Sequence, residues 1–199
     1  MKRIVSSLLA LSLVLTMAPA AFAAGSGGTM TIAQIVARSG GTFDNKGYDF
    51  DILLTAVDAA GLTAALADPS AELTVFAPKD RAFVMTARDL GYGGWDEAGA
   101  WTFLVSALTA LGNGDPIPVL RNVLLYHVVP GALSASEVRA SDSIPTLLSG
   151  ASIFPYGKQR IGDNDPDFID ARLVDGRTDI AASNGVSHVI TKGLRPLDL

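Results

Sequence analysis

The chain has 199 residues, no cysteine and a net charge of −5, with 20 acidic residues against 15 basic ones. An acidic balance disfavours nucleic acid and anionic membranes as partners, because both attract basic patches. The lack of cysteine excludes a fold held by disulfides, and two histidines are too few for a zinc site. A hydrophobic core must therefore hold the chain, whose length suits one domain.

The N-terminal residues have the pattern of a secretory signal peptide. A basic start, Lys2-Arg3, precedes an apolar stretch over residues 4–17, and Ala21-Phe22-Ala23 is a small-x-small cleavage site. The apolar stretch is shorter than the ~20 residues that cross a bilayer, so we expect no membrane anchor. We predict a signal peptide at 1–23, a flexible linker at 24–30, and a protein secreted to the periplasm or the extracellular space.

Residues 31–199 are predicted to form one domain in which helices come first and strands later. Apolar residues at helical spacing predict helices at 31–38, on both sides of Gly61 within 48–66, from Asp80, at 103–111 and up to about Tyr126, with one helical turn at 134–137. After a first strand at Leu73, short β-like runs occupy 144–148, 151–154, 168–174 and 186–190. This order favours an α+β fold over an alternating α/β one.

Three segments mix apolar runs with turn residues. In the first, the run that begins at Leu73 ends at Pro78, which cannot donate to a sheet, and Asp80 is placed to cap the helix that follows. In the second, Pro130-Gly131 closes an apolar run that contains Tyr126 and His127.

The third segment opens with Asn184-Gly185, a strong hairpin signal because both residues tolerate positive φ. His188 follows in an alternating strand pattern. Pro78, Asp80, His127, Pro130, Gly131, Asn184, Gly185 and His188 are thus expected to have structural roles.

His127 and His188 raise the alternative of an extracytoplasmic hydrolase that uses one of them as a base. Neither lies near a Gly-x-Ser-x-Gly turn, and both lie in strand-like apolar runs. We therefore favour buried imidazoles that hydrogen-bond to neighbouring groups.

Closely spaced carboxylates at Asp163, Asp165 and Asp167 form a candidate calcium site, because calcium prefers oxygen ligands. The spacing is not that of an EF-hand, whose sixth and twelfth positions would fall on Phe168 and Val174. An acidic, solvated turn between strands is the favoured interpretation.

A glycine-rich segment, 91–101, carries Tyr92, Trp95 and Trp101. These aromatic residues could form a platform for a partner or a lid over the helices, and large aromatic side chains usually bury themselves. A third function, a small-ligand carrier gated by this loop, stays open.

Taken together, three ordered motifs resemble those of the fasciclin domain, an extracellular adhesion module. They are TVFAPKDRAF at 74–83, YHVVPG at 126–131 and DIAASNGVSHVI at 179–190. The resemblance implies a wedge of seven strands with helices along one side, no catalysis and no cofactor. It also implies a protein or a cell-surface or matrix component as partner, and we expect a monomer.

In animal members of this family, integrin contact is attributed to an aspartate–isoleucine pair before the last motif and to the tyrosine–histidine region. These positions fall on Asp179-Ile180 and Tyr126-His127. The preceding Arg177-Thr178 departs from the acidic residue and proline of animal members. With Trp95, the two pairs are the candidate binding residues.

Overall fold

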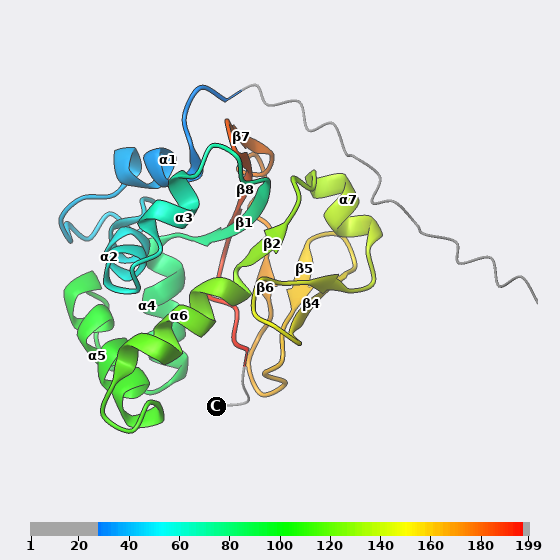
Figure 1. The fold of residues 1–199 in the computed structure, drawn as a ribbon. Coiled ribbons are helices and arrows are strands. Elements are labelled where there is room, and N and C mark those ends of the chain that lie inside the picture. The colour runs from blue at the N-terminus through cyan, green and yellow to red at the C-terminus, as the bar shows by residue number, and fades with distance from the viewer. Residues whose placement is uncertain (1–27, 197–199) are drawn as a thin grey trace, which may run out of the picture.

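The computed structural model describes residues 28–196. Within that range it contains seven helices and two four-stranded sheets, which confirms the predicted α+β class (Figure 1). The predicted signal peptide, 1–23, lies outside the described residues, as does most of the predicted linker. The described end of that linker is attached to the fold, since the Met30 carbonyl accepts a hydrogen bond from the Ser183 N–H at 2.8 Å.

Six helices lie on one side of the first sheet. They are α1 (Ile32–Ser39), α2 (Asp51–Ala59), α3 (Thr63–Ala67), α4 (Asp80–Asp89), α5 (Glu97–Leu111) and α6 (Pro116–Tyr126). The seventh helix, α7 (Ala135–Ala140), lies apart from these six. The strands are β1 (Leu73–Pro78), β2 (Val128–Pro130), β3 (Ile144–Pro145), β4 (Ser152–Tyr156), β5 (Arg160–Gly162), β6 (Ala171–Arg172), β7 (Ile180–Ala182) and β8 (Gly185–Ile190).

The first sheet has the strand order β2-β1-β8-β7, in which β1 and β8 are parallel and the outer pairs are antiparallel. Residues 73–78 pair with residues 185–190, so two motifs that are distant in sequence form the centre of the sheet. All six residues of β1 are buried because the strand is covered on both faces.

Alternation along β1 separates two cores. Leu73, Val75 and Ala77 pack against the helices, whereas Phe76 faces the second sheet. The second sheet, with the order β3-β4-β5-β6, is antiparallel throughout and closes the second core together with α7.

The number of strands and the start of one helix differ from prediction. Residues 28–196 contain eight short strands in place of the seven that the family resemblance implied, and β2 and β7 have three residues each. Such strands carry too few residues for an alternating pattern. Helix α5 begins at Glu97, capped by Asp96, so Trp101 is helical and the glycine-rich loop is shorter than predicted.

The predicted N-cap role of Asp80 is wrong. Lys79 occupies the N-cap position of α4, and its side chain makes no capping bond. The buried Asp80 carboxylate instead accepts hydrogen bonds from the N–H groups of Asp51 at 3.0 Å and Ile52 at 2.7 Å, at the start of α2. Asp80 therefore satisfies free donors of a different helix, whose own N-cap residue, Phe50, has no acceptor in its side chain.

Candidate functional site

The predicted binding residue Tyr126 is inside the protein. It is fully buried at the end of α6, and its hydroxyl donates a hydrogen bond to the Ser152 carbonyl of β4 at 2.8 Å. Burial raises the pKa of the phenol. Tyr126 thus joins the helical layer to the second sheet, and its place in the binding set needs correction, because no partner can reach it.

His127 is also buried, and it is the C-cap residue of α6 rather than part of a strand. Its Nδ1–H donates to the Val123 carbonyl at 2.8 Å, and its Nε2 accepts from the Leu194 N–H at 2.8 Å. These partners define one neutral tautomer. Burial lowers the pKa of the imidazole to about 4, so His127 holds the C-terminal segment against α6 and has no nitrogen free for catalysis.

Acid should destabilise the protein through His127. The unfolded imidazole binds a proton below about 6.5, and the folded one only below about 4. The stabilisation is therefore complete above pH 6.5 and decreases as the pH falls toward 4, by roughly 3 kcal/mol at most. Denaturant unfolding from pH 7 to 4 should show a steeper loss for the wild type than for His127→Gln.

The contribution of Asp80 to stability changes in the opposite direction in the same pH window, because burial raises its pKa to about 7. Its protonation therefore favours the folded state as the pH falls. Both proteins contain Asp80, so the comparison isolates the histidine. An NMR titration in which His127 has a midpoint near 6.5 would contradict the proposed burial.

His188 and Asp179 form one structural unit. The His188 ring is buried beside Phe76, its Nε2–H donates to the Leu133 carbonyl at 2.9 Å, and its Nδ1 accepts from the Asp179 N–H at 3.1 Å. Asp179 is exposed with φ at 56°, and its carboxylate accepts from the Ala135 N–H at 2.7 Å. Its partners therefore hold Asp179 at the start of α7.

Ile180 is half-buried in β7 and packs against the helical core, so only part of the Asp179-Ile180 pair is accessible. Trp95 is 60% exposed, and the Arg88 guanidinium lies 3.8 Å from its ring centroid. Tyr92 packs on Phe103 of α5. Within the glycine-rich loop, Tyr92 thus matches the predicted lid, whereas Trp95 does not.

The predicted binding residues do not form one surface. Tyr126 and His127 are buried, Trp95 lies between α4 and α5, and Asp179 lies beside α7 on the opposite side of the molecule (Figure 1). As contact residues, Trp95 and Asp179-Ile180 would therefore act separately.

The acidic turn at Asp163, Asp165 and Asp167 is solvated only in part, since Asp167 is exposed whereas Asp165 is buried. Asp165 is buried and pairs with Arg195, with 3.0 Å between the carboxylate and Nε. The Asp163 carboxylate accepts from the Asp165 N–H at 3.0 Å and the Arg195 N–H at 2.8 Å. A cation bound here would compete with Arg195, so we interpret the turn as an anchor for the C-terminal segment.

An exposed apolar face on the second sheet was missed at the sequence level. Phe154 and Tyr156 of β4 are 42% and 45% exposed, and Ile169, just before β6, is 67% exposed. The Tyr156 hydroxyl bonds to the Asp170 carboxylate, which brings this segment beside β4. The alternation of Ile153 and Pro155 with the two aromatic residues was the available signal.

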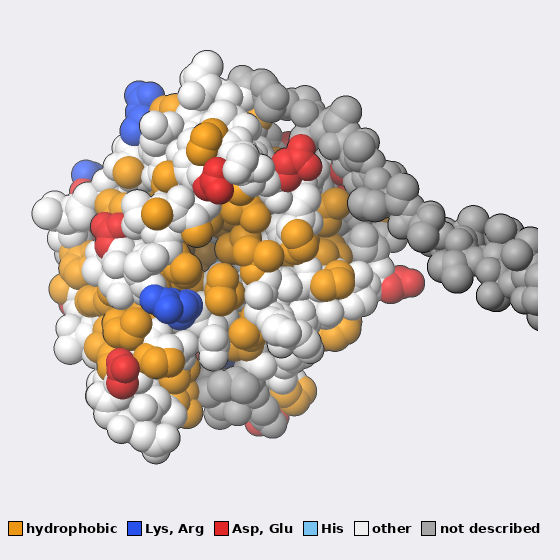
Figure 2. All heavy atoms as spheres, in the orientation of Figure 1, with side chains coloured by type: hydrophobic (Ala, Val, Ile, Leu, Met, Phe, Trp, Pro, Cys, Tyr) orange, Lys and Arg blue, Asp and Glu red, His pale blue; other side chains and the backbone are white. Residues whose placement is uncertain are grey.

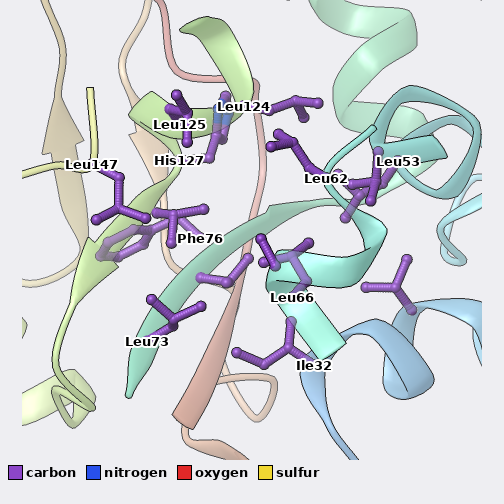
Figure 3. A pocket seen from close by; sticks show the side chains of 15 residues that line it. Ile32, Leu53, Leu62, Leu66, Leu73, Phe76, Leu124, Leu125, His127 and Leu147 are labelled. Atoms are coloured by element: carbon purple, nitrogen blue, oxygen red, sulfur yellow. The ribbon is translucent and has the colours of Figure 1, made fainter. Parts of the chain in front are cut away.

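Two apolar cavities adjoin the helical core. The first, of about 50 Å³, lies between α1, α3, β1 and α6, where Ile32, Leu66, Leu124 and Leu147 surround it (Figure 3). In Figure 2, apolar side chains gather in this middle region of the face. The second, of about 90 Å³, lies between α4, α5 and α6.

Both cavities are far smaller than the ~300–1,000 Å³ of typical ligand pockets. Trp95 lines neither of them, so it does not gate either one. The small-ligand carrier hypothesis gains no support from these volumes.

A mixed sheet covered by helices on one face and by a second sheet on the other defines an α+β domain with no accessible imidazole among the described residues. The family model of the fasciclin domain matches residues 48–196, and the chain belongs to the fasciclin domain family. Fasciclin domains are generally non-enzymatic binding domains and are typically extracellular.

Two known proteins illustrate the relationship. The chain is 32% identical over 169 residues to protein sll1483 of Synechocystis, a match that covers 84% of this chain and 74% of the relative. A solved fasciclin domain pair from the insect cell adhesion molecule Fasciclin I matches 84% of this chain with a TM-score of 0.58 and 15% identity. The match spans 51% of that two-domain chain, and at this identity it shows the fold alone.

Within residues 28–196 no single helix has both the length and the hydropathy to cross a bilayer. Helices α5 and α6 reach these values only when taken together, and the chain bends by 107° between them.

Proposed function

We propose that this chain acts outside the cytoplasm as a non-enzymatic adhesion or binding module. Its contacts are with a protein, a matrix component or a surface glycan. The fasciclin domain over residues 48–196 carries this proposal. The predicted signal peptide at 1–23 supports the extracytoplasmic location. The backbone partners of both histidines argue against the hydrolase alternative.

The outer face of β4 is the best-supported contact surface. Phe154 and Tyr156 expose apolar area on one sheet face, and Arg160 lies 5.9 Å from the Tyr156 ring. Ile169 is also exposed, in the segment that the Tyr156–Asp170 hydrogen bond holds beside β4. Aromatic and arginine side chains dominate the binding energy of many interfaces. Neither the Phe154 ring nor the Tyr156 ring is part of a hydrophobic core, so the two side chains contribute little to the stability of the fold.

The double substitution Phe154→Ser with Tyr156→Ser should weaken adhesion about tenfold or more, since truncated hot-spot residues often cost over ~2 kcal/mol. The measurement is the attachment of beads coated with purified protein to immobilised cell-surface protein or polysaccharide. Tyr48→Ser is the matched control, because Tyr48 is 67% exposed in the loop before α2. Thermal unfolding of each variant should stay near that of the wild type.

Loss of attachment in Asp179→Ala but not in the β4 variant would move the contact to the pair implied by the family resemblance. Loss in Trp95→Ala alone would move it to the loop between α4 and α5. Equal attachment of all variants and of uncoated beads would refute the adhesion role.

A further inference from the structure

Five carboxylates converge at the start of three helices. They come from the loop before α2 and from the first residues of α2, α4 and α5: Asp44, Asp49, Asp51, Asp80 and Glu97. We call this set the carboxylate cluster. It comprises two groups of three that share Glu97, and in each group the oxygens lie within 4.8 Å of one another.

Three oxygen atoms of the cluster are buried without a hydrogen-bond partner among the described residues. Asp51 and Glu97 are each only 2% exposed. Glu97 Oε2 accepts from the N–H groups of Asp44 at 3.1 Å and Asn45 at 2.9 Å, but Oε1 has no partner. Asp51 Oδ1 accepts a hydrogen bond from the Gly41 N–H, whereas Asp51 Oδ2 has no partner. Asp49 Oδ1 also has no partner among the described residues.

Basic residues do not neutralise the cluster. Within residues 28–196 the carboxylate cluster forms one ion pair, between Asp44 and the largely exposed Lys46. Arg81 lines the small cavity beside Glu97 but forms no ion pair with it. Burial raises the pKa of Asp80 and that of Glu97, which reflects the cost of placing these negative charges together.

Protonation alone does not satisfy this arrangement. A proton shared between Asp49 and Asp80 removes one charge, yet it leaves the free oxygens of Asp51 and Glu97 without partners. Asp44, Asp51 and Glu97 offer carboxylate oxygens within 4.8 Å of one another, so one bound cation would serve both Asp51 and Glu97. Ligands that are all oxygens favour a hard cation over a soft metal, and calcium accepts a flexible set of oxygens more readily than octahedral magnesium does.

We propose that the carboxylate cluster binds one Ca²⁺ ion, with Asp44, Asp51 and Glu97 as direct ligands. The ion joins the loop before α2 to the start of α5, while Asp80 holds the start of α2 behind it. This site differs from the acidic turn at 163–167, where Arg195 already contacts the carboxylates of Asp163 and Asp165.

The test uses the purified chain, stripped with chelator and dialysed at constant ionic strength. Calorimetric titration with CaCl₂ should give one ion per chain. Calcium at a hundredfold excess over Kd should raise the Tm by about 5–10 °C, because binding to the folded state alone stabilises it. Titration with MgCl₂ should give weaker binding, and equal binding of both ions would overturn the assignment to calcium.

Glu97→Gln should abolish the calcium response. Without calcium its Tm should equal or exceed that of the wild type, because the change removes a buried charge and keeps an acceptor for Asp44 and Asn45. Asp51→Asn, which keeps an acceptor for the Gly41 N–H, gives a second test if Glu97→Gln does not fold. Asp167→Asn, an exposed change in the acidic turn, is the control and should keep the full response.

If the calorimetric titration of the wild type with CaCl₂ shows no binding, the proposed site is refuted. A response that survives Glu97→Gln and Asp51→Asn but is lost in Asp167→Asn would place the ion at the acidic turn instead.

Discussion

Replacing Asn184 with alanine is expected to destabilise the fold by roughly 3–5 kcal/mol, since each orphaned buried partner costs about 1–3 kcal/mol. Asn184 is buried, and its amide bridges three segments. Its Oδ1 accepts from the Ile32 N–H at 2.9 Å, and its Nδ2 donates to the carbonyls of Leu66 at 3.0 Å and Asp68 at 2.9 Å. Urea unfolding at neutral pH measures the change.

Ser183→Ala is the matched control for Asn184→Ala. Ser183 lies in the same two-residue turn, and no hydrogen bond of its side chain is present among the described residues. The control should change stability by less than ~0.5 kcal/mol, as most substitutions outside special sites do. A loss under about 1 kcal/mol in Asn184→Ala would mean that water replaces the amide's partners.

Gly185→Ala is expected to have an effect of similar size for a different reason. Gly185 pairs with Leu73 at the start of the parallel β1–β8 pair, with φ at 144°. A Cβ at this position would lie 1.9 Å from the Leu73 carbonyl oxygen. Backbone strain and displacement of a central strand together should cost roughly 3–5 kcal/mol, measured as a fall in the unfolding free energy.

Gly131→Ala separates strain from steric conflict. Gly131 also has positive φ, 87°, but a Cβ there would meet no atom within 4 Å. Its replacement should therefore cost only about 1–2 kcal/mol, the penalty of a left-handed conformation. Equal effects at Gly131 and Gly185 would show that β1 shifts easily to accept the added methyl group.

Much of the fold could be predicted from the sequence because the signals are local. The break at Gly61 between α2 and α3, the helix up to Tyr126 and the hairpin at 183–184 follow from periodicity and turn residues. The hairpin is present, but Asn184 does not have the positive φ that the turn signal implied. Its buried side-chain amide stabilises the turn region instead. The three motifs indicated the family, which the domain match over 48–196 shows.

The candidate site was harder to predict, since exposure depends on which elements meet. Tyr126 and His127 are polar residues in an apolar run, a pattern that favoured an internal hydrogen bond for His127, while the family resemblance made both residues candidate contacts. Their partners, Ser152 and Leu194, are 26 and 67 positions away along the chain, and no local rule relates them.

Asp80 shows the same division within one residue. Its position before an apolar helix predicted a cap, and the chemistry was right, because its carboxylate does accept two helix N–H groups. The prediction named the wrong helix. The two N–H groups belong to Asp51 and Ile52 of α2, which are 29 and 28 positions before Asp80 and come close to it only in the folded chain.

The sequence by itself determined the helices, the main strand alternation, the turns and the family, because these follow from interactions between residues close together along the chain. Only the tertiary structure decided which groups the two buried histidines bind, that Phe154 and Tyr156 face outward, and that Glu97 joins four aspartates from the segments at 44–51 and 80. Burial and charge pairing are sums over neighbours brought together by folding, so they are absent from any single segment.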